Sequence, residues 1–201
     1  MSRTSDALAE LLKRTTGDGL DASAMITALE QKGVDASEAL GDLWRIEAFK
    51  ARHEDRSEEF GDLWRLGTHF DWLFAALVGL RTLADKERLR EEDVKPLWEG
   101  TERFGAQLGM DEFYRTIGAL ARSRKTAPAL LEVVDDLLHR QNIREWWWLA
   151  LTAVAEIASR KTAEIPPILR QDLDQKVRQQ ETDRARLEQA ETLLKQLEAS
   201  S

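Results

Sequence analysis

The spacing of apolar residues is the feature that most restricts what this chain can fold into. Apolar side chains recur three and four positions apart along the whole sequence, the pattern of a helix with one buried face. No run alternates β-branched or aromatic residues with polar ones, as a half-buried strand would. We therefore expect an all-α fold, a compact multi-helix bundle of about eight short-to-medium helices with a long C-terminal helix.

Capping residues indicate where individual helices begin and end. Gly33 stands where glycine commonly closes a helix, and Asp35 or Ser37 can accept the free amide protons of the next one. Thr126 precedes another apolar run in the same way. The Pro166-Pro167 pair must interrupt the helical pattern, because proline lacks the amide proton and clashes with the preceding turn. Each of these positions predicts a helix boundary.

Composition divides the chain, whose 201 residues suit one domain with an appendage, into two parts. Residues 1–164 carry the apolar helical pattern and form the predicted bundle. Within them, residues 84–95 include the most polar connector, which we interpret as a soft hinge. Residues 165–201 are rich in glutamine and charge, and no glycine or proline follows the proline pair. This second part predicts one long, solvated C-terminal helix.

The composition excludes several classes of protein. Cysteine is absent, which rules out disulfide frameworks, thiolate zinc sites and cysteine nucleophiles. The 37 acidic and 29 basic residues leave a net charge of −8, so the chain as a whole is not attracted to nucleic acid or to an anionic membrane. We find no secretory signal and no apolar run of the roughly 18–20 residues that a membrane helix needs. We expect a cytoplasmic protein with no membrane partner.

A tryptophan-bearing phrase occurs twice in the first half of the chain. The sequence GDLWR spans 41–45 and again 61–65, within the longer SEALGDLWRI and SEEFGDLWRL. Each copy follows a serine suited to N-capping and a glutamate suited to the first turn of a helix. We interpret the repeat as a reused helix start, with the two copies opening the two helices of an antiparallel hairpin. Two copies are too few for a solenoid.

Tests for catalytic chemistry are negative. The histidines, His53, His69 and His139, show no paired metal spacing, and Asp136 with His139 is a single carboxylate-x-x-His unit where a di-iron bundle needs two. Neither a glycine-rich phosphate loop nor a nucleophile elbow is present. We therefore expect no catalytic residue, no cofactor and no metal, and a protein that is not an enzyme.

Asp71 is the one carboxylate that the pattern places on an apolar helix stripe. A buried carboxylate must be paired, hydrogen-bonded or protonated, because an unpaired buried charge is very costly. We favour a structural bond to an indole, an arginine or a helix end. The alternative is a small-molecule sensor or enzyme with a pocket near Asp71.

The triple tryptophan at 146–148 is the densest signal in the sequence. Three consecutive helical residues span about 200°, so one core cannot receive all three rings equally. Trp147 lies on the strongest apolar face, and Trp148 points instead toward a lane that holds Arg144 and Thr152. Another helix of the same chain, the long C-terminal helix or a different protein can cover Trp148, and packing within the chain is the more ordinary of these. Because interface centres are enriched in tryptophan and arginine, our functional hypothesis is that this lane binds a partner, and that Trp148→Ala weakens partner capture while sparing stability.

The C-terminal segment carries a broken heptad stripe, coiled-coil-like and apolar only toward its ends. Three of its leucines, Leu187, Leu194 and Leu197, complete the predicted partner-binding set, and the stripe also allows self-association. The sequence thus predicts a non-enzymatic interaction or scaffold subunit of a larger intracellular assembly. It binds a protein partner through an aromatic patch and the C-terminal helix.

Basic residues at two helix ends support a different class of function. Cations at a helix C-terminus are ordinarily solvated caps that complement the helix dipole. If the two ends lay together, they would form a phosphate-binding patch, and the chain would contact nucleic-acid backbone within a ribonucleoprotein complex. The predicted phosphate-binding residues are Arg122, Arg124, Lys125 and Arg140.

Overall fold

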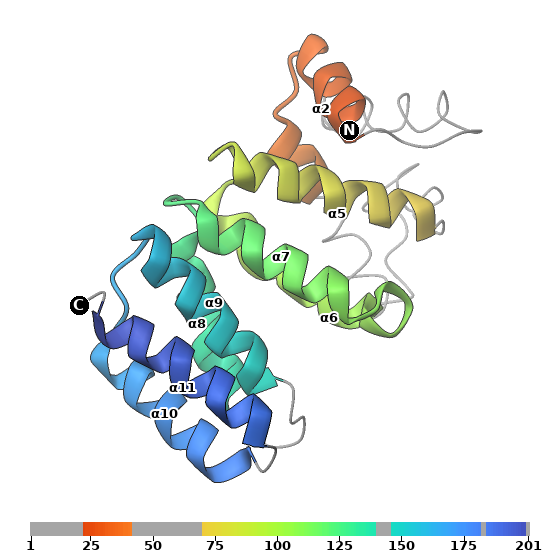
Figure 1. Cartoon of the computed structure of the whole chain (residues 1–201). Helices are drawn as coiled ribbons and strands as arrows, with labels where there is room; N and C mark the ends of the chain where they lie inside the picture. The colour runs from red at the N-terminus through yellow and green to blue at the C-terminus, as the bar shows by residue number, and fades with distance from the viewer. Residues whose placement is uncertain (1–21, 42–69, 140–145, 182–183, 200–201) are drawn as a thin grey trace.

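The computed structural model describes residues 22–41, 70–139, 146–181 and 184–199 (Figure 1). Every regular element within these ranges is a helix, so the predicted all-α class is confirmed. Residues 36–41 are also helical. The described helices are α2 (Ala22–Gln31), α5 (Phe70–Asp85), the 3-10 helix η2 (Glu91–Asp93), α6 (Val94–Leu108), α7 (Met110–Arg122), α8 (Ala127–His139), α9 (Trp146–Arg160), α10 (Pro167–Gln180) and α11 (Arg184–Ala199).

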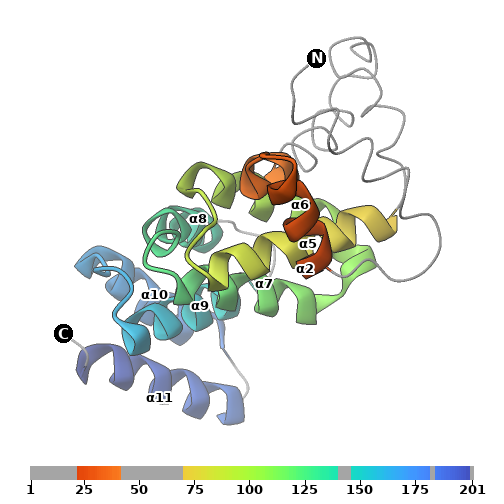
Figure 2. The same ribbon diagram turned by 90° about the horizontal axis from the view of Figure 1, so that it is seen from above.

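The helices stack from one end of the molecule to the other. In Figures 1 and 2, α2 and α5 lie at one end, α6 and α7 follow, and the α10–α11 pair lies at the opposite end. Helix α9 is central, because α7, α8, α10 and α11 all pack against it. No helix among the described residues has both the length and the apolar character to cross a lipid bilayer.

Local capping explains two helix boundaries near the N-terminal end. Gly33 adopts a left-handed φ of 69°, and the amides of Gly33 and Val34 donate to the carbonyls of Glu30 and Leu29 at 2.9 and 3.1 Å. This is the Schellman closure that glycine favours, as predicted. Asp35 accepts the Glu38 amide at 2.9 Å, so Asp35 is the side-chain cap of the next helix.

Ser37, the other residue considered for that cap, takes part in a buried network instead. Its hydroxyl donates to Asp93 Oδ2 at 2.9 Å and accepts the Arg90 amide at 3.1 Å. Asp93 also accepts from Arg90 Nε at 2.7 Å, and this hydrogen bond raises the pKa of the Arg90 guanidinium above its ordinary value. Helix 36–41 is thereby tied to the segment 84–95, the predicted hinge.

Gly41, the first residue of the first GDLWR copy, packs against this network. A methyl group at Gly41 would lie 2.5 Å from Asp93 Oδ1, a distance that side chains do not tolerate. Glycine is therefore required here by close packing. The remainder of both copies, and with it the predicted hairpin, lies outside the described residues.

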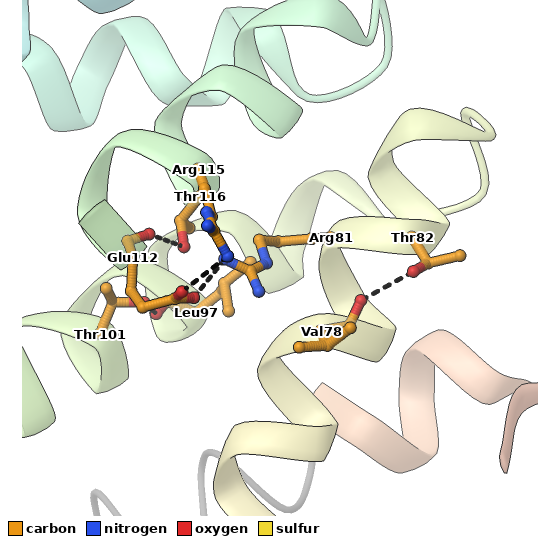
Figure 3. Close-up of polar contacts among 8 residues, drawn as sticks. All are labelled: Val78, Arg81, Thr82, Leu97, Thr101, Glu112, Arg115 and Thr116. Carbon is orange, nitrogen blue, oxygen red and sulfur yellow. Dashed lines mark hydrogen bonds and ion pairs between the residues drawn. The ribbon is translucent and has the colours of Figure 1, made fainter. Parts of the chain in front are cut away.

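A second buried ion pair joins α5 to α7. Arg81 Nη1 lies 2.5 Å from Glu112 Oε2 (Figure 3). Both side chains are largely buried. Glu112 also accepts a hydrogen bond from Arg115 at 3.2 Å, and the Arg115 side chain is 66% exposed. The carboxylate thus has one buried and one solvated cationic partner, which satisfies the charge that burial would otherwise leave unpaired.

The C-terminal segment differs from the predicted single long helix. Helix α9 ends at Arg160 and α10 begins at Pro167, so the proline interruption is confirmed. Helix α10 then ends at Gln180, because Glu181 has an extended backbone with φ −87° and ψ 121°. The result is a pair of helices of modest length. Helix α11 packs along α9, with Ala190 and Leu197 in the core.

Candidate functional site

The exposed edge of α8 separates two hollows in the surface. In Figure 2, α8 lies with the start of α6 on one side and α10 on the other, and α8 packs against both. We call the two hollows and the edge between them the α8 groove. Both hollows include Glu132 and Asp135, which shows that they adjoin.

The first hollow, of about 860 Å³, is acidic. Six of its lining residues carry carboxylates, against one lysine and one histidine. Glu92 has a cationic neighbour, since it lies 3.0 Å from Arg90, whereas Glu99 and Glu132 have no hydrogen bond or ion pair with any described residue. The charged and titratable lining residues are Glu91, Glu92, Lys95, Glu99, Glu132, Asp135, Asp136 and His139.

An aromatic cluster forms the wall beneath this hollow. Trp98 contacts Phe113 and Trp146 edge-to-face, with ring centroids 5.6 and 5.9 Å apart. Trp98 lines the hollow although only 2% of it is exposed. Its indole N–H is buried and has no acceptor among the described residues. The acidic edge therefore stands over a rigid apolar base.

The second hollow, of about 620 Å³, is predominantly apolar. Ile168 stands at its side with 62% of its surface exposed, although isoleucine is usually buried. The acids of this hollow are Glu132, Asp135 and Glu164. Its apolar lining consists of Pro128, Leu131, Ala163, Pro166, Ile168 and Leu169.

Trp148, the predicted partner contact, is partly covered by other residues of the chain. Its ring is half-buried, with the Arg186 guanidinium carbon 5.4 Å from the ring centroid and the Trp147 ring 5.3 Å away, edge-to-face. Thr152 uses its hydroxyl to donate to the Trp148 carbonyl at 2.9 Å. Arg144, the last member of this lane, lies outside the described residues.

The predicted leucines of the C-terminal segment also face the body of the protein. Leu197 is 2% exposed and belongs to the core, so it is inaccessible to a partner while α11 stays in place. Leu187 and Leu194 are partly buried and pack against the same core. These residues therefore stabilise the packing of α11 on the bundle.

The predicted phosphate-binding residues have acidic neighbours. Arg122 forms an ion pair with Asp85 at 2.9 Å, and the backbone amide of Arg124 donates to Glu87 at 3.3 Å. Lys125 is exposed. Arg122 is thus paired with a carboxylate, whereas the side chains of Arg124 and Lys125 are exposed, and the phosphate-binding patch stays a prediction. Arg140 lies outside the described residues.

Asp71 lies in the first turn of α5, and its side chain is outside the described part of the chain. The pocket predicted beside it therefore stays a prediction.

No family model, no curated protein and no solved structure matches this chain. The structure alone therefore describes the protein: it is an all-α protein with an acidic and partly apolar groove along one helix. Sequence reasoning missed this groove, although α8 carried a signal. Its polar residues at 132, 135, 136 and 139 follow the helical spacing of one solvated face, opposite the buried leucines and valines.

Proposed function

We propose that this chain is a non-enzymatic interaction subunit of a larger assembly, and that it binds a basic, partly apolar segment of a partner protein in the α8 groove. The observation that carries the proposal is the juxtaposition of an exposed isoleucine in an apolar hollow with an adjoining edge of carboxylates. Apolar hollows with a polar rim are typical of protein-binding surfaces.

The charge of the groove selects the chemistry of the partner. Six carboxylate residues and one lysine line the first hollow, so its potential attracts cations and repels acidic segments. Complementary charge mainly accelerates association and sets the register of binding. Lysine and arginine side chains of the partner would face Glu99 and Glu132, whose carboxylates have no partner among the described residues.

The apolar hollow supplies the affinity. Ile168, Leu131 and Leu169 line a cavity large enough to take apolar side chains of a bound segment. Burying that surface is worth about 25 cal/mol per Å². A segment whose apolar residues lie beside its basic residues meets both hollows at once, because the hollows adjoin along α8, and a helix laid in the groove would do this.

This proposal moves the partner surface away from the one that the sequence predicts. Trp148 offers a partner only part of its ring, because Arg186 of α11 and the Trp147 ring lie against it. The charged edge of the α8 groove and Ile168 are exposed and need no rearrangement to be contacted. Rigid-body binding is the ordinary expectation for such a surface.

Copurification from the native cell tests the proposal, with quantitative mass analysis of the proteins captured by matched variants. Glu132→Lys and Ile168→Glu should each reduce capture of the same partner by about tenfold or more. Met110→Glu changes the other large exposed apolar side chain among the described residues, and Glu188→Lys reverses an exposed charge on α11. Both controls should leave capture unchanged. Equal capture by all four variants would overturn the proposal.

A further inference from the structure

We propose a divalent metal site at one end of α8, formed by Asp135 and His139 of α8 and Asp172 of α10. One ligand atom from each residue lies within 4.8 Å of the other two. Asp135 and His139 are one helical turn apart and share a face. Asp172, which lies 33 positions after His139 in the sequence, reaches them from α10. The site shares Asp135 and His139 with the rim of the α8 groove, but it is inferred from the ligand geometry alone and does not rest on the function proposed above.

A hydrogen bond to the backbone engages one ring nitrogen of the histidine and leaves the other available to a metal. His139 Nδ1 lies 2.7 Å from the backbone carbonyl oxygen of Asp135. A carbonyl can only accept a hydrogen bond, so Nδ1 carries the proton and the lone pair of the neutral ring is on Nε2. Metal-binding histidines in proteins typically donate their second ring N–H to such an acceptor, which fixes the ring and its tautomer.

The carboxylate of Asp172 is available to a metal ion. Asp172 is half-buried, and its carboxylate makes no hydrogen bond or ion pair with any residue that the structure describes. Lys176, one turn further along α10, lines the neighbouring hollow with His139 and Asp172. No ion pair between Lys176 and Asp172 forms within the described part of the chain, although their i,i+4 spacing would permit one.

The donor set selects the kind of ion. One imidazole nitrogen and two carboxylate oxygens suit Zn²⁺ and similar first-row divalent ions, which accept mixed nitrogen and oxygen ligands. Mg²⁺ and Ca²⁺ favour oxygen ligands alone. Tetrahedral Zn²⁺ places its ligand atoms about 3.4 Å apart. The side chains of Asp135 and His139 are 58% and 67% exposed, so they can rotate to close the remaining distance. The bound ion would cross-link α8 to α10.

Titration of the full chain with ZnCl₂, followed by calorimetry, tests this site. The wild-type chain should bind one Zn²⁺ and melt at a higher temperature when zinc is present, since a ligand of the folded state stabilises it. His139→Ala and Asp172→Asn should each weaken Zn²⁺ binding by about tenfold or more. The double variant His53→Ala with His69→Ala removes the other histidines and should bind as the wild type does.

A second measurement keeps the test independent of variant folding. Co²⁺ added to the wild-type chain should broaden the NMR signals of the His139 imidazole more than those of the remaining histidines. The proposal is overturned if the wild type binds no Zn²⁺, if Asp172→Asn binds as tightly as the wild type, or if Mg²⁺ displaces Zn²⁺ at equal concentration. Any of these negative results would leave the proposed binding of a basic segment untouched, because that binding is tested without metal through Glu132 and Ile168, which are not ligands of the site.

Discussion

Arg186 lies over the ring of Trp148, with its guanidinium carbon 5.4 Å from the ring centroid. This contact joins α11 to the first turn of α9 and is a cation–π interaction between residues 38 positions apart in the sequence. It makes Trp148 part of the intramolecular packing. The C-terminal helix is thereby an integral layer of the bundle.

The contact predicts that Trp148 contributes to stability. Trp148→Ala should lower the free energy of unfolding by about 2 kcal/mol, because a half-buried indole loses its contacts with Arg186 and Trp147. Arg186→Ala should cost about 0.5–1 kcal/mol. Arg184→Ala, whose side chain is 93% exposed, is the matched control. Urea denaturation measures all three, and wild-type stability in Trp148→Ala would show that α11 does not cover the ring in solution.

Arg81 and Arg115, which both bind Glu112, should contribute different amounts to the free energy of unfolding. Arg81→Ala removes the buried partner and leaves a largely buried carboxylate undercompensated, which should cost about 3 kcal/mol. Arg115→Ala removes the exposed partner of the same carboxylate and should cost less than about 1 kcal/mol. Thermal or chemical denaturation distinguishes them. Equal losses of stability in the two variants would mean that burial does not make the Arg81–Glu112 pair contribute more than an exposed pair.

Gly41 should not tolerate a methyl group. Gly41→Ala places a carbon 2.5 Å from an oxygen of Asp93, which Ser37 and Arg90 hold in position, so the change should cost about 1–3 kcal/mol. Gly118→Ala is the helical control. Its new methyl would meet only the far end of the long Arg122 side chain at 3.1 Å, which can shift by a few tenths of an ångström, and alanine favours the helix. A melting temperature at or above that of the wild type is expected for Gly118→Ala, and the same result for Gly41→Ala would refute the packing argument.

Leu197 should behave as a core residue although it lies near the end of α11. Leu197→Ala should destabilise the protein by about 2–3 kcal/mol, because the side chain is 2% exposed. Ile168→Ala truncates a side chain that is 62% exposed and should change stability by less than about 0.5 kcal/mol. Denaturation midpoints compare the two. A smaller loss for Leu197 than for Ile168 would contradict the observed packing of α11.

The features that the sequence predicts correctly are those set by neighbouring residues. The helical class follows from apolar spacing, and the boundaries at Gly33, Asp35 and the proline pair follow from local backbone chemistry. Thr126 precedes α8 as predicted, but its hydroxyl donates to the Leu120 carbonyl at 2.8 Å and so anchors the end of α7. Local patterns thus identify the boundary but not the partner of the side chain.

The features that the sequence does not predict depend on contacts between distant residues. No glycine or proline marks the helix end at Glu181, whose carboxylate is buried and lies 3.9 Å from Arg186. Trp148 is partly covered because α11 packs against α9 and brings Arg186 over its ring. The α8 groove likewise needs walls from α6 and from residues 163–169, and the metal ligands combine one turn of α8 with α10. Spacing along a single helix cannot reveal these combinations.

Carboxyl footprinting tests the central claim, that a partner occupies the α8 groove, most directly. The free chain and its complex with the captured partner are labelled with carbodiimide, and the modified residues are quantified by mass spectrometry. Labelling of Glu99 and Glu132 should fall in the complex, while labelling of Glu188 and Glu191 on α11 should be unchanged. Protection of Glu188 and Glu191 with Glu99 and Glu132 still fully labelled would contradict it.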